Sequence, residues 1–418
     1  MKKLEQRVPN LRFKGFTNDW EQRKLGDEYK HIGNAFVGTA SPYYTQNGYF
    51  YLESNNIKNG QINHDHEVFI NESFYHKQLN KLLHTGDLVM VQSGHVGDTA
   101  VITEKYNGTA AHALIMFRKP KNNMLSFFLN SFFQSSNAKN RIDVLAIGNT
   151  IRHILASDMK KFVVYLPDNK EKGEVAELFL ELQKLIALQQ RKLELLKQLK
   201  KGLLQKMFAD KDSKQPVLRF KGFHDDWEQH KLGEVCEKTY SGLTGKNKQD
   251  FGHGKAKYIT YLNVHDNAIA TTKGVDQVEI DPKQNEVVKG DLLFTVSSEV
   301  PEEVALNSVW PGTDNNVYLN SFCFGMRPMS KSVNSFFLTY YLRSPQMRRN
   351  IYPLAQGISR FNISKRGILS LTINLPNIRE QINVYKVIKN IECLVTLQHQ
   401  KLAKYQSIKK SLLQQMFI

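Results

Sequence analysis

Runs in which apolar and polar residues alternate occur in two separate parts of the chain. Such runs, bounded by turn residues, predict β-strands at "GDLVMVQSG" from Gly86, "KKFVVYLP" from Lys160, "GDLLFTVSS" from Gly290 and "ILSLTINLP" from Ile368. Between them, "MLSFFLNSFFQSS" from Met124 and "VNSFFLTYYLRSP" from Val333 have the spacing of amphipathic helices. Short strands mixed with helices predict an α+β fold for both parts.

Two further stretches carry the apolar spacing of long helices. No proline interrupts residues 170–208 or 377–417, and apolar residues recur there at alternating steps of three and four. This heptad pattern predicts a helix of about 38 residues, about 57 Å long, in each stretch. The predicted apolar seam is formed by Phe179, Leu182, Ile186, Leu193, Leu196, Leu203 and Met207, and by Ile388, Ile391, Val395, Leu402, Tyr405, Leu412 and Met416.

The seam is interrupted at the same two places in both stretches, by Gln189 and Lys200 in the first and by Gln398 and Lys409 in the second. We expect the helices to form an antiparallel coiled coil in which Gln189 faces Lys409 and Lys200 faces Gln398. Each lysine then meets an amide oxygen, and such a polar layer fixes the register at a cost in stability. A slip of one heptad also satisfies the pattern. In a different arrangement, each helix packs only on its own globular part.

The chain contains a unit of about 210 residues in two copies. The segments "VPNLRFKGFTNDWEQRKLGD" and "QPVLRFKGFHDDWEQHKLGE" are identical at 14 of 20 positions, and "LLQKMF" near residue 203 returns as "LLQQMF" near residue 412. We therefore expect an internal pseudo-twofold repeat. The predicted parts are an α+β domain at 1–169, a long helix at 170–210, a second α+β domain at 211–377 and a second long helix at 378–418.

Composition narrows the classes of function. The chain has 57 Lys and Arg against 40 Asp and Glu, a net charge of +17, which favours a polyanionic partner such as nucleic acid over a merely basic surface. The three cysteines show no CxxC spacing, so a disulfide framework or a zinc site is not expected. Neither a membrane-spanning run nor a secretory signal is recognisable. These features predict a cytoplasmic protein.

The sequence offers no pattern typical of a catalytic, metal or cofactor site. "SGLTGKN" from Ser241 lacks the glycine spacing of a phosphate-binding loop. "LPDNKEK" from Leu166 has the acids and lysine of a nuclease set, but its counterpart "LPNIREQ" does not, so Asp168 is interpreted as a helix cap. "HDH" from His64 has no predictable third ligand. We expect no catalytic residues, no metal and no cofactor.

The order of these motifs resembles that of the specificity subunit of Type I restriction-modification systems. The resemblance covers essentially the whole chain. It rests on the "W-E-Q-x-K-L-G" openings at Trp20 and Trp227, the "SGLTGKNKQDFGHGKAKYITYLNV" run, both "GDL" strands, the segments after Gly148 and Gly357, and the Leu-Pro that precedes each long helix. No single motif is diagnostic, but their duplicated order is specific.

The resemblance implies two target recognition domains, each reading one half of a split double-stranded DNA sequence. Two long antiparallel helices would separate these domains and set the distance between the half-sites. The subunit itself would do no chemistry. It would dock two modification subunits that use S-adenosylmethionine to methylate adenine, and ATP-driven restriction subunits would join the full complex.

DNA contacts are expected in loops that carry basic and amide side chains, since lysine and arginine neutralise phosphates and polar side chains read base edges. The candidates are Gln92, Ser93, His95, Asn149, Arg152 and His153 in the first half, and Lys246, Lys248, Lys255, Arg360, Asn362, Lys365 and Arg366 in the second. For each of them, the alternative is a solvated loop residue.

The repeated "LRFKGF" segment is interpreted as framework, with its aromatic and leucine side chains packed on the helices and its Arg and Lys available to phosphate or partner subunits. Two other functional classes stay open. One is a stand-alone DNA-binding regulator or architectural protein without enzymatic partners. The other is an enzyme whose site the motifs do not reveal.

Overall fold

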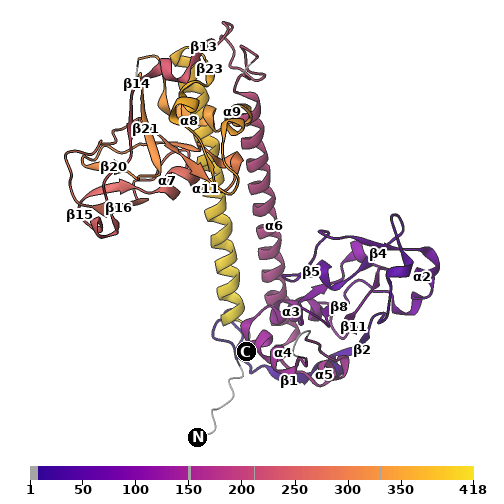
Figure 1. Cartoon of the computed structure of the whole chain (residues 1–418). Helices are drawn as coiled ribbons and strands as arrows, with labels where there is room; N and C mark the ends of the chain where they lie inside the picture. Colours follow the sequence, from indigo (N-terminus) through magenta and orange to yellow (C-terminus); the bar gives the residue numbers. More distant parts are fainter. Residues whose placement is uncertain (1–7, 149–151, 211, 330) are drawn as a thin grey trace. The chain divides into compact units, whose positions relative to one another are not determined.

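The computed structural model describes residues 8–148, 152–210, 212–329 and 331–418. The chain forms two compact units: unit 1 is Met1–Arg191 with Gln400–Ile418, and unit 2 is Lys192–His399. Each unit contains one α+β part, called its globular part, and portions of two long helices. Figure 1 shows these helices, α6 (Asn169–Lys206) in magenta and α11 (Ile378–Gln415) in yellow.

The globular part of unit 1 is built on short strands. These are β1 (Glu21–Lys24), β2 (Tyr29–Asn34), β3 (Tyr44–Thr45), β4 (Tyr49–Leu52), β5 (Ile57–Lys58), β6 (Gln61–Ile62), β7 (Val68–Ile70), β8 (Leu88–Val91), β9 (Thr99–Val101), β10 (Ala110–Ala111), β11 (Leu114–Pro120) and β12 (Val163–Leu166). One antiparallel sheet has the order β2-β11-β8-β9, and a mixed sheet has the order β10-β4-β7-β3. The interior strand β8 is buried along its whole length, which explains its continuous apolar run.

The short helices of unit 1 are α1 (Leu25–Glu28), α2 (Glu72–His76), α3 (Leu125–Phe133), α4 (Ser136–Leu145) and α5 (Ala156–Lys161). Helix α3 is buried on nearly every side, since its "LSFFLNSFF" sequence is largely apolar. Strand β1 pairs with β12 immediately before α6 begins. Between β5 and β6, Asn59 and Gly60 have φ of 55° and 81°, the left-handed values of a tight hairpin turn, which favours Asn-Gly at this position.

Unit 2 repeats this architecture. Its strands are β13 (Glu228–Lys231), β14 (Cys236–Ser241), β15 (Phe251–Ile259), β16 (Val275–Val278), β17 (Leu292–Thr295), β18 (Ser297–Ser298), β19 (Asn307–Val309), β20 (Val317–Leu319), β21 (Cys323–Pro328), β22 (Phe361–Asn362) and β23 (Thr372–Leu375). Its sheet β14-β21-β17-β19 has the same order as β2-β11-β8-β9. The short helices are α7 (Tyr261–Asp266), α8 (Ser335–Leu342), α9 (Pro345–Ile351) and α10 (Lys365–Leu369). The predicted α+β repeat and its four predicted strands are confirmed.

The two long helices pack together within each unit. In unit 1, Phe179 of α6 stacks on Phe417 just beyond α11, with 5.5 Å between ring centroids, and Gln190 and Gln406 further along line one cavity. The helices are therefore antiparallel there. In unit 2, Met207 just beyond α6 belongs to the same apolar core as Ile388 of α11.

The predicted seam residues are all buried or half-buried, including Gln189, Lys200, Gln398 and Lys409. The two lysines have oxygen partners that the heptad pattern did not indicate. Lys200 forms an ion pair with Glu392 at 2.6 Å, and Lys409 donates a hydrogen bond to Gln134 of the globular part at 2.7 Å. The proposed facing of each lysine with a glutamine of the other helix stays a prediction.

The repeated opening segment attaches each globular part to both long helices. Arg12 donates to Glu171 of α6 at 2.6 and 2.7 Å, and the amide of Leu11 donates to the carbonyl of Gln415 at the end of α11. The second copy repeats both contacts: Arg219 donates to Glu380, and Leu218 donates to Lys206. Each guanidinium is paired with a buried carboxylate, and contact of these arginines with phosphate or partner subunits stays a prediction. The framework role of the segment fits its position, since Trp20 lies in the core of unit 1.

Candidate nucleic-acid interface

In unit 1, the chain leaving β8 lies against the segment that precedes α5. Ser93 and His153 form an antiparallel bridge, and their side chains are joined by a hydrogen bond of 2.9 Å between Oγ and Nδ1. On one side of this bridge, the amide of Ile154 donates to the carbonyl of Gln92 at 3.0 Å. The fold thus brings together the predicted residues Gln92, Ser93, His95, Arg152 and His153. Asn149, predicted with them, lies outside the described residues.

The side chains of this cluster differ in how far they are already engaged. His95 contacts the carbonyls of Ser54 and Ile57 through Nε2, at 3.0 and 3.3 Å, and thereby supports the neighbouring loop. Arg152 forms an ion pair with Asp143 at 2.8 Å. In contrast, Oε1 of Gln92 is buried and has no hydrogen-bond partner among the described residues. Because this oxygen is shielded from solvent, it can accept a hydrogen bond from a base edge only after the Gln92 side chain turns outward.

We call the backbone pairing of the residues after β8 with the segment before α5 the frame of unit 1. Unit 2 builds the same frame with different side chains. Strand β18 pairs with β22, so that Ser297 faces Asn362, and the amide of Ile363 donates to the carbonyl of Val296 at 3.0 Å. Val296, Ser297 and Asn362 stand where unit 1 has Gln92, Ser93 and His153. Predicted residues Arg360 and Asn362 are exposed in this frame. A common backbone that presents different polar groups can read different base sequences.

Sequence reasoning missed several residues of the second frame. Ser297 and Ser298 follow β17 as Ser93 follows β8, and the alignment of "GDLLFTVSS" with "GDLVMVQSG" carried that signal. Phe322, 56% exposed, lies 5.9 Å from the guanidinium of Arg360. Tyr261 donates a hydrogen bond to the carbonyl of Ser297 at 2.7 Å. No local pattern indicated that these two aromatic residues would lie beside the frame.

The three predicted lysines of unit 2 are not equivalent. Lys246 forms an ion pair with Asp281 at 2.8 Å, which raises the pKa of Lys246 and lowers the pKa of the Asp281 carboxyl. Lys248 and Lys255 are exposed, Lys248 at the start of the short 3-10 helix Lys248–Asp250 and Lys255 in β15. Charge available to a phosphate is therefore greater at Lys248 and Lys255, because Asp281 balances Lys246.

The remaining predicted residues, Lys365 and Arg366, begin helix α10. The hydroxyl oxygen of Ser364 caps this helix by accepting from the amide of Gly367 at 3.0 Å. Both basic side chains are exposed and follow Asn362 by a few residues.

The motifs set aside as non-catalytic have structural partners. Asp168 accepts hydrogen bonds from the amides of Lys170 and Glu171, both at 2.9 Å, which confirms its role as the cap of α6. His64 of "HDH" bonds Glu67 at 2.5 Å. Across the described residues, the structure contains no group of three or more His, Cys, Asp or Glu placed to hold a metal ion. None of the helices in that part of the chain has the length and hydrophobicity needed to cross a bilayer.

Comparison with known proteins identifies the family. A family model described as the Type I restriction modification DNA specificity domain matches residues 17–198 and again 224–406. The putative Type I restriction enzyme MjaX specificity subunit of Methanocaldococcus jannaschii is 22% identical, over 94% of this chain and 92% of that protein. The matches follow the two copies seen in the sequence.

Solved structures share the fold. The S subunit of a Type I restriction-modification system from M. genitalium matches with a TM-score of 0.59 at 15% identity, covering 98% of this chain and 99% of the other. A chain from a study of assembly and conformational transition of the Type I restriction-modification system matches with a TM-score of 0.52 at 16% identity, covering 94% and 96%. By its doubled family match, this chain belongs to the Type I restriction-modification specificity subunits, the non-catalytic family that supplies DNA target specificity.

Proposed function

We propose that the chain reads a bipartite double-stranded DNA target, with one half-site recognised by the globular part of each unit. The observation that carries this proposal is the shared frame. Ser93 faces His153 in unit 1 as Ser297 faces Asn362 in unit 2, on the same backbone pairing but with different polar groups. Two related readers with different side chains recognise two different sequences, whereas a symmetric dimer reads a palindrome.

Affinity in this proposal comes from basic residues of the two globular parts. Arg152, Lys248, Lys255, Arg360, Lys365 and Arg366 neutralise phosphates, and Gln92, Ser93, His153 and Asn362 contact base edges. His95, Lys246 and Asn149 also stay proposed DNA contacts, and His95 and Lys246 in addition order their loops through the contacts described above. The net charge of +17 supports a polyanionic partner.

The long helices act as the spacer between the two target recognition domains. We place the domains at 1–169 and 211–377, with the spacer helices at 170–210 and 378–418. The seam from Leu182 to Met207 and from Ile391 to Met416 forms their interface, and its polar positions fix the register. The distance between half-sites follows from the length of this coiled coil.

The chain assembles with enzymatic subunits into a DNA-binding Type I restriction-modification complex in the cytoplasm. Apolar side chains on the helix surfaces of unit 2 support such docking: Leu195, Leu199, Leu394 and Leu397 are about half exposed. In this proposal two modification subunits methylate adenine within the target, and ATP-dependent restriction subunits join the full complex. A stand-alone regulator would have no use for this apolar surface.

Mapping of methylated adenines by long-read sequencing, in cells that carry this chain with its modification subunit, tests the proposal. We expect methylation at one split motif of constant gap. Exchange of residues 211–377 for those of a related specificity subunit should replace one half of the motif and leave the other half and the gap unchanged. A continuous motif, or a change in both halves, would contradict it, and so would failure to form a stable complex with the modification subunit.

A further inference from the structure

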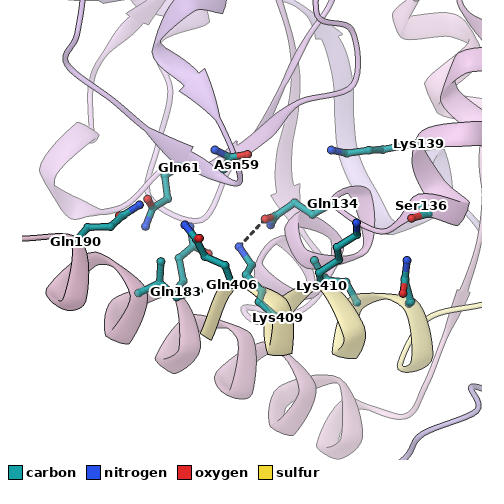
Figure 2. Close-up of a pocket in the computed structure, with 13 residues that line it drawn as sticks. Asn59, Gln61, Gln134, Ser136, Lys139, Gln183, Gln190, Gln406, Lys409 and Lys410 are labelled. Atoms are coloured by element: carbon teal, nitrogen blue, oxygen red, sulfur yellow. Dashed lines mark hydrogen bonds between the residues drawn. The ribbon is translucent and has the colours of Figure 1, made fainter. Parts of the chain in front are cut away.

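A cavity of about 440 Å³ lies in unit 1 between the globular part and the two long helices. Figure 2 shows its lining: Lys139 extends from α4, and Lys409 and Lys410 extend from α11 toward the same space. Of the 13 lining residues, three are lysines, seven are Asn or Gln, and none is Asp or Glu. The lining therefore carries positive charge and hydrogen-bonding amides without a carboxylate.

Lys409 is the most constrained of these lysines. Its ammonium donates to Oε1 of Gln134 at 2.7 Å, a neutral partner that does not balance its charge. Burial lowers the pKa of Lys409 to about 8, and the nearby charge of Lys139 acts in the same direction. A half-buried lysine in these surroundings is stabilised when an anion enters.

At the equivalent position in unit 2, a carboxylate of the chain itself balances the lysine. Lys200, the counterpart of Lys409, forms an ion pair with Glu392 at 2.6 Å, and Tyr340 also donates a hydrogen bond to Glu392. The counterpart of Glu392 in unit 1 is Gln183, whose amide nitrogen donates to the carbonyl of Gly60 at 3.3 Å. Unit 1 thus keeps the lysine of this position and replaces the acid with an amide.

We propose that this cavity binds a small anionic ligand whose carboxylate or phosphate group lies against Lys409, Lys139 and Lys410. The anion takes the place that the Glu392 carboxylate has in unit 2. The surrounding amides, such as Gln61 and Gln190, supply donors and acceptors for the rest of the molecule. A cavity of this size lies in the range that accommodates small molecules.

The proposal is separate from DNA recognition, because none of the residues proposed to contact DNA lines the cavity. Its lining comes from the β5–β6 hairpin, the end of α3, α4, α6 and α11, so a bound anion contacts the globular part and both helices. A ligand that binds only the folded chain stabilises it. We therefore expect the ligand to strengthen the attachment of the globular part of unit 1 to its helices.

Isothermal titration calorimetry on the full chain tests the site, with inorganic phosphate in one arm and citrate in the other, each compared with chloride at equal ionic strength. We expect saturable binding of one anion per chain in at least one arm, and the arm that binds identifies the preferred oxyanion. Lys409→Gln should weaken this binding at least about tenfold, since it removes a charged donor. Gln183→Glu should also weaken anion binding, because it places a carboxylate at the position that Glu392 has in unit 2.

Lys201→Gln is the matched control, because Lys201 is the counterpart of Lys410 on the equivalent helix in unit 2. It should leave anion affinity unchanged. Absence of saturable binding in both arms would overturn the proposal, as would equal weakening by Lys201→Gln, which indicates attraction to the surface in general. Melting temperatures of the variants check that each chain is folded. If Lys409→Gln and Gln183→Glu both leave saturable binding intact, the proposal is also overturned.

Discussion

Arg12 donates two hydrogen bonds to the carboxylate of Glu171, at 2.6 and 2.7 Å, and that carboxylate is almost entirely buried. The indole nitrogen of Trp20 lies 3.3 Å from the same carboxylate. Arg219 and Glu380 repeat the pair in unit 2. A segment written twice in the sequence therefore makes the same attachment twice, between the start of a globular part and the first turn of a long helix.

Arg12→Ala should destabilise unit 1, because Glu171 would keep its charge in a buried place without a partner. Removal of one member of a buried ion pair costs about 3 to 5 kcal/mol. Thermal unfolding and hydrogen exchange of the α6 amides would report the loss, and Arg219→Ala should give the equivalent loss in unit 2. Lys14→Ala, at an exposed position of the same segment, is the control. Equal melting temperatures for Arg12→Ala and Lys14→Ala would refute the structural role of the pair.

Gln92→Ala should relax discrimination at one base pair of one half-site, by about 1 to 3 kcal/mol, if the Gln92 side chain reads a base edge. Asn362→Ala should have the corresponding effect in the other half-site only. Competition binding with duplexes randomised in one half at a time measures both. If either variant changes both halves alike, the assignment of one frame to each half-site fails.

Lys255→Ala should reduce the slope of log affinity against log salt concentration by about 0.9, the value for one phosphate neutralised. Lys246→Ala should reduce it less, because Asp281 already balances the charge of Lys246 at 2.8 Å. Titrations of the assembled complex with a cognate duplex at several salt concentrations provide the slopes. Equal reductions in the two variants would show that the ion pair opens when DNA binds.

Lys409 should make stability depend on pH above neutrality. Burial lowers its pKa from 10.5 to about 8, so between these values the unfolded chain binds more protons than the folded one. The free energy of unfolding should therefore rise with pH across this window, by about 1 to 3 kcal/mol relative to Lys409→Met. Urea unfolding of both proteins on either side of the window measures the difference. A constant difference would mean that Lys409 titrates as an exposed lysine.

The double variant Ile186→Cys with Leu412→Cys should form a disulfide if the predicted register is right, because disulfides require Cα atoms about 4.4 to 6.8 Å apart. Ile186 and Leu413 already line the same cavity of unit 1. The background needs Cys393→Ser, since Cys393 is exposed on α11. Peptide mapping after mild oxidation gives the result. If Ile186→Cys crosslinks only when it is combined with Tyr405→Cys, the helices are slipped by one heptad.

The sequence alone determined the repeat, the two long helices and the strands that frame the interface. These features are local. The heptad spacing from Phe179 to Met207 and the apolar run of β8 are both visible in short, continuous stretches of sequence. The duplication also showed which segments are framework. The geometry of a helix or strand sets which sequence positions share one face, so the spacing of apolar residues in the sequence reveals these elements.

Tertiary structure decided the partners of individual side chains. Lys409 meets Gln134, which is 275 residues away, and Arg12 meets Glu171, which is 159 residues away. The heptad pattern indicated a polar layer but could not show that Glu392 completes it in unit 2 while Gln183 leaves a cavity in unit 1. Such contacts depend on how separate elements pack. The spacing of residues along the chain does not indicate which residues distant in sequence will meet in the folded protein.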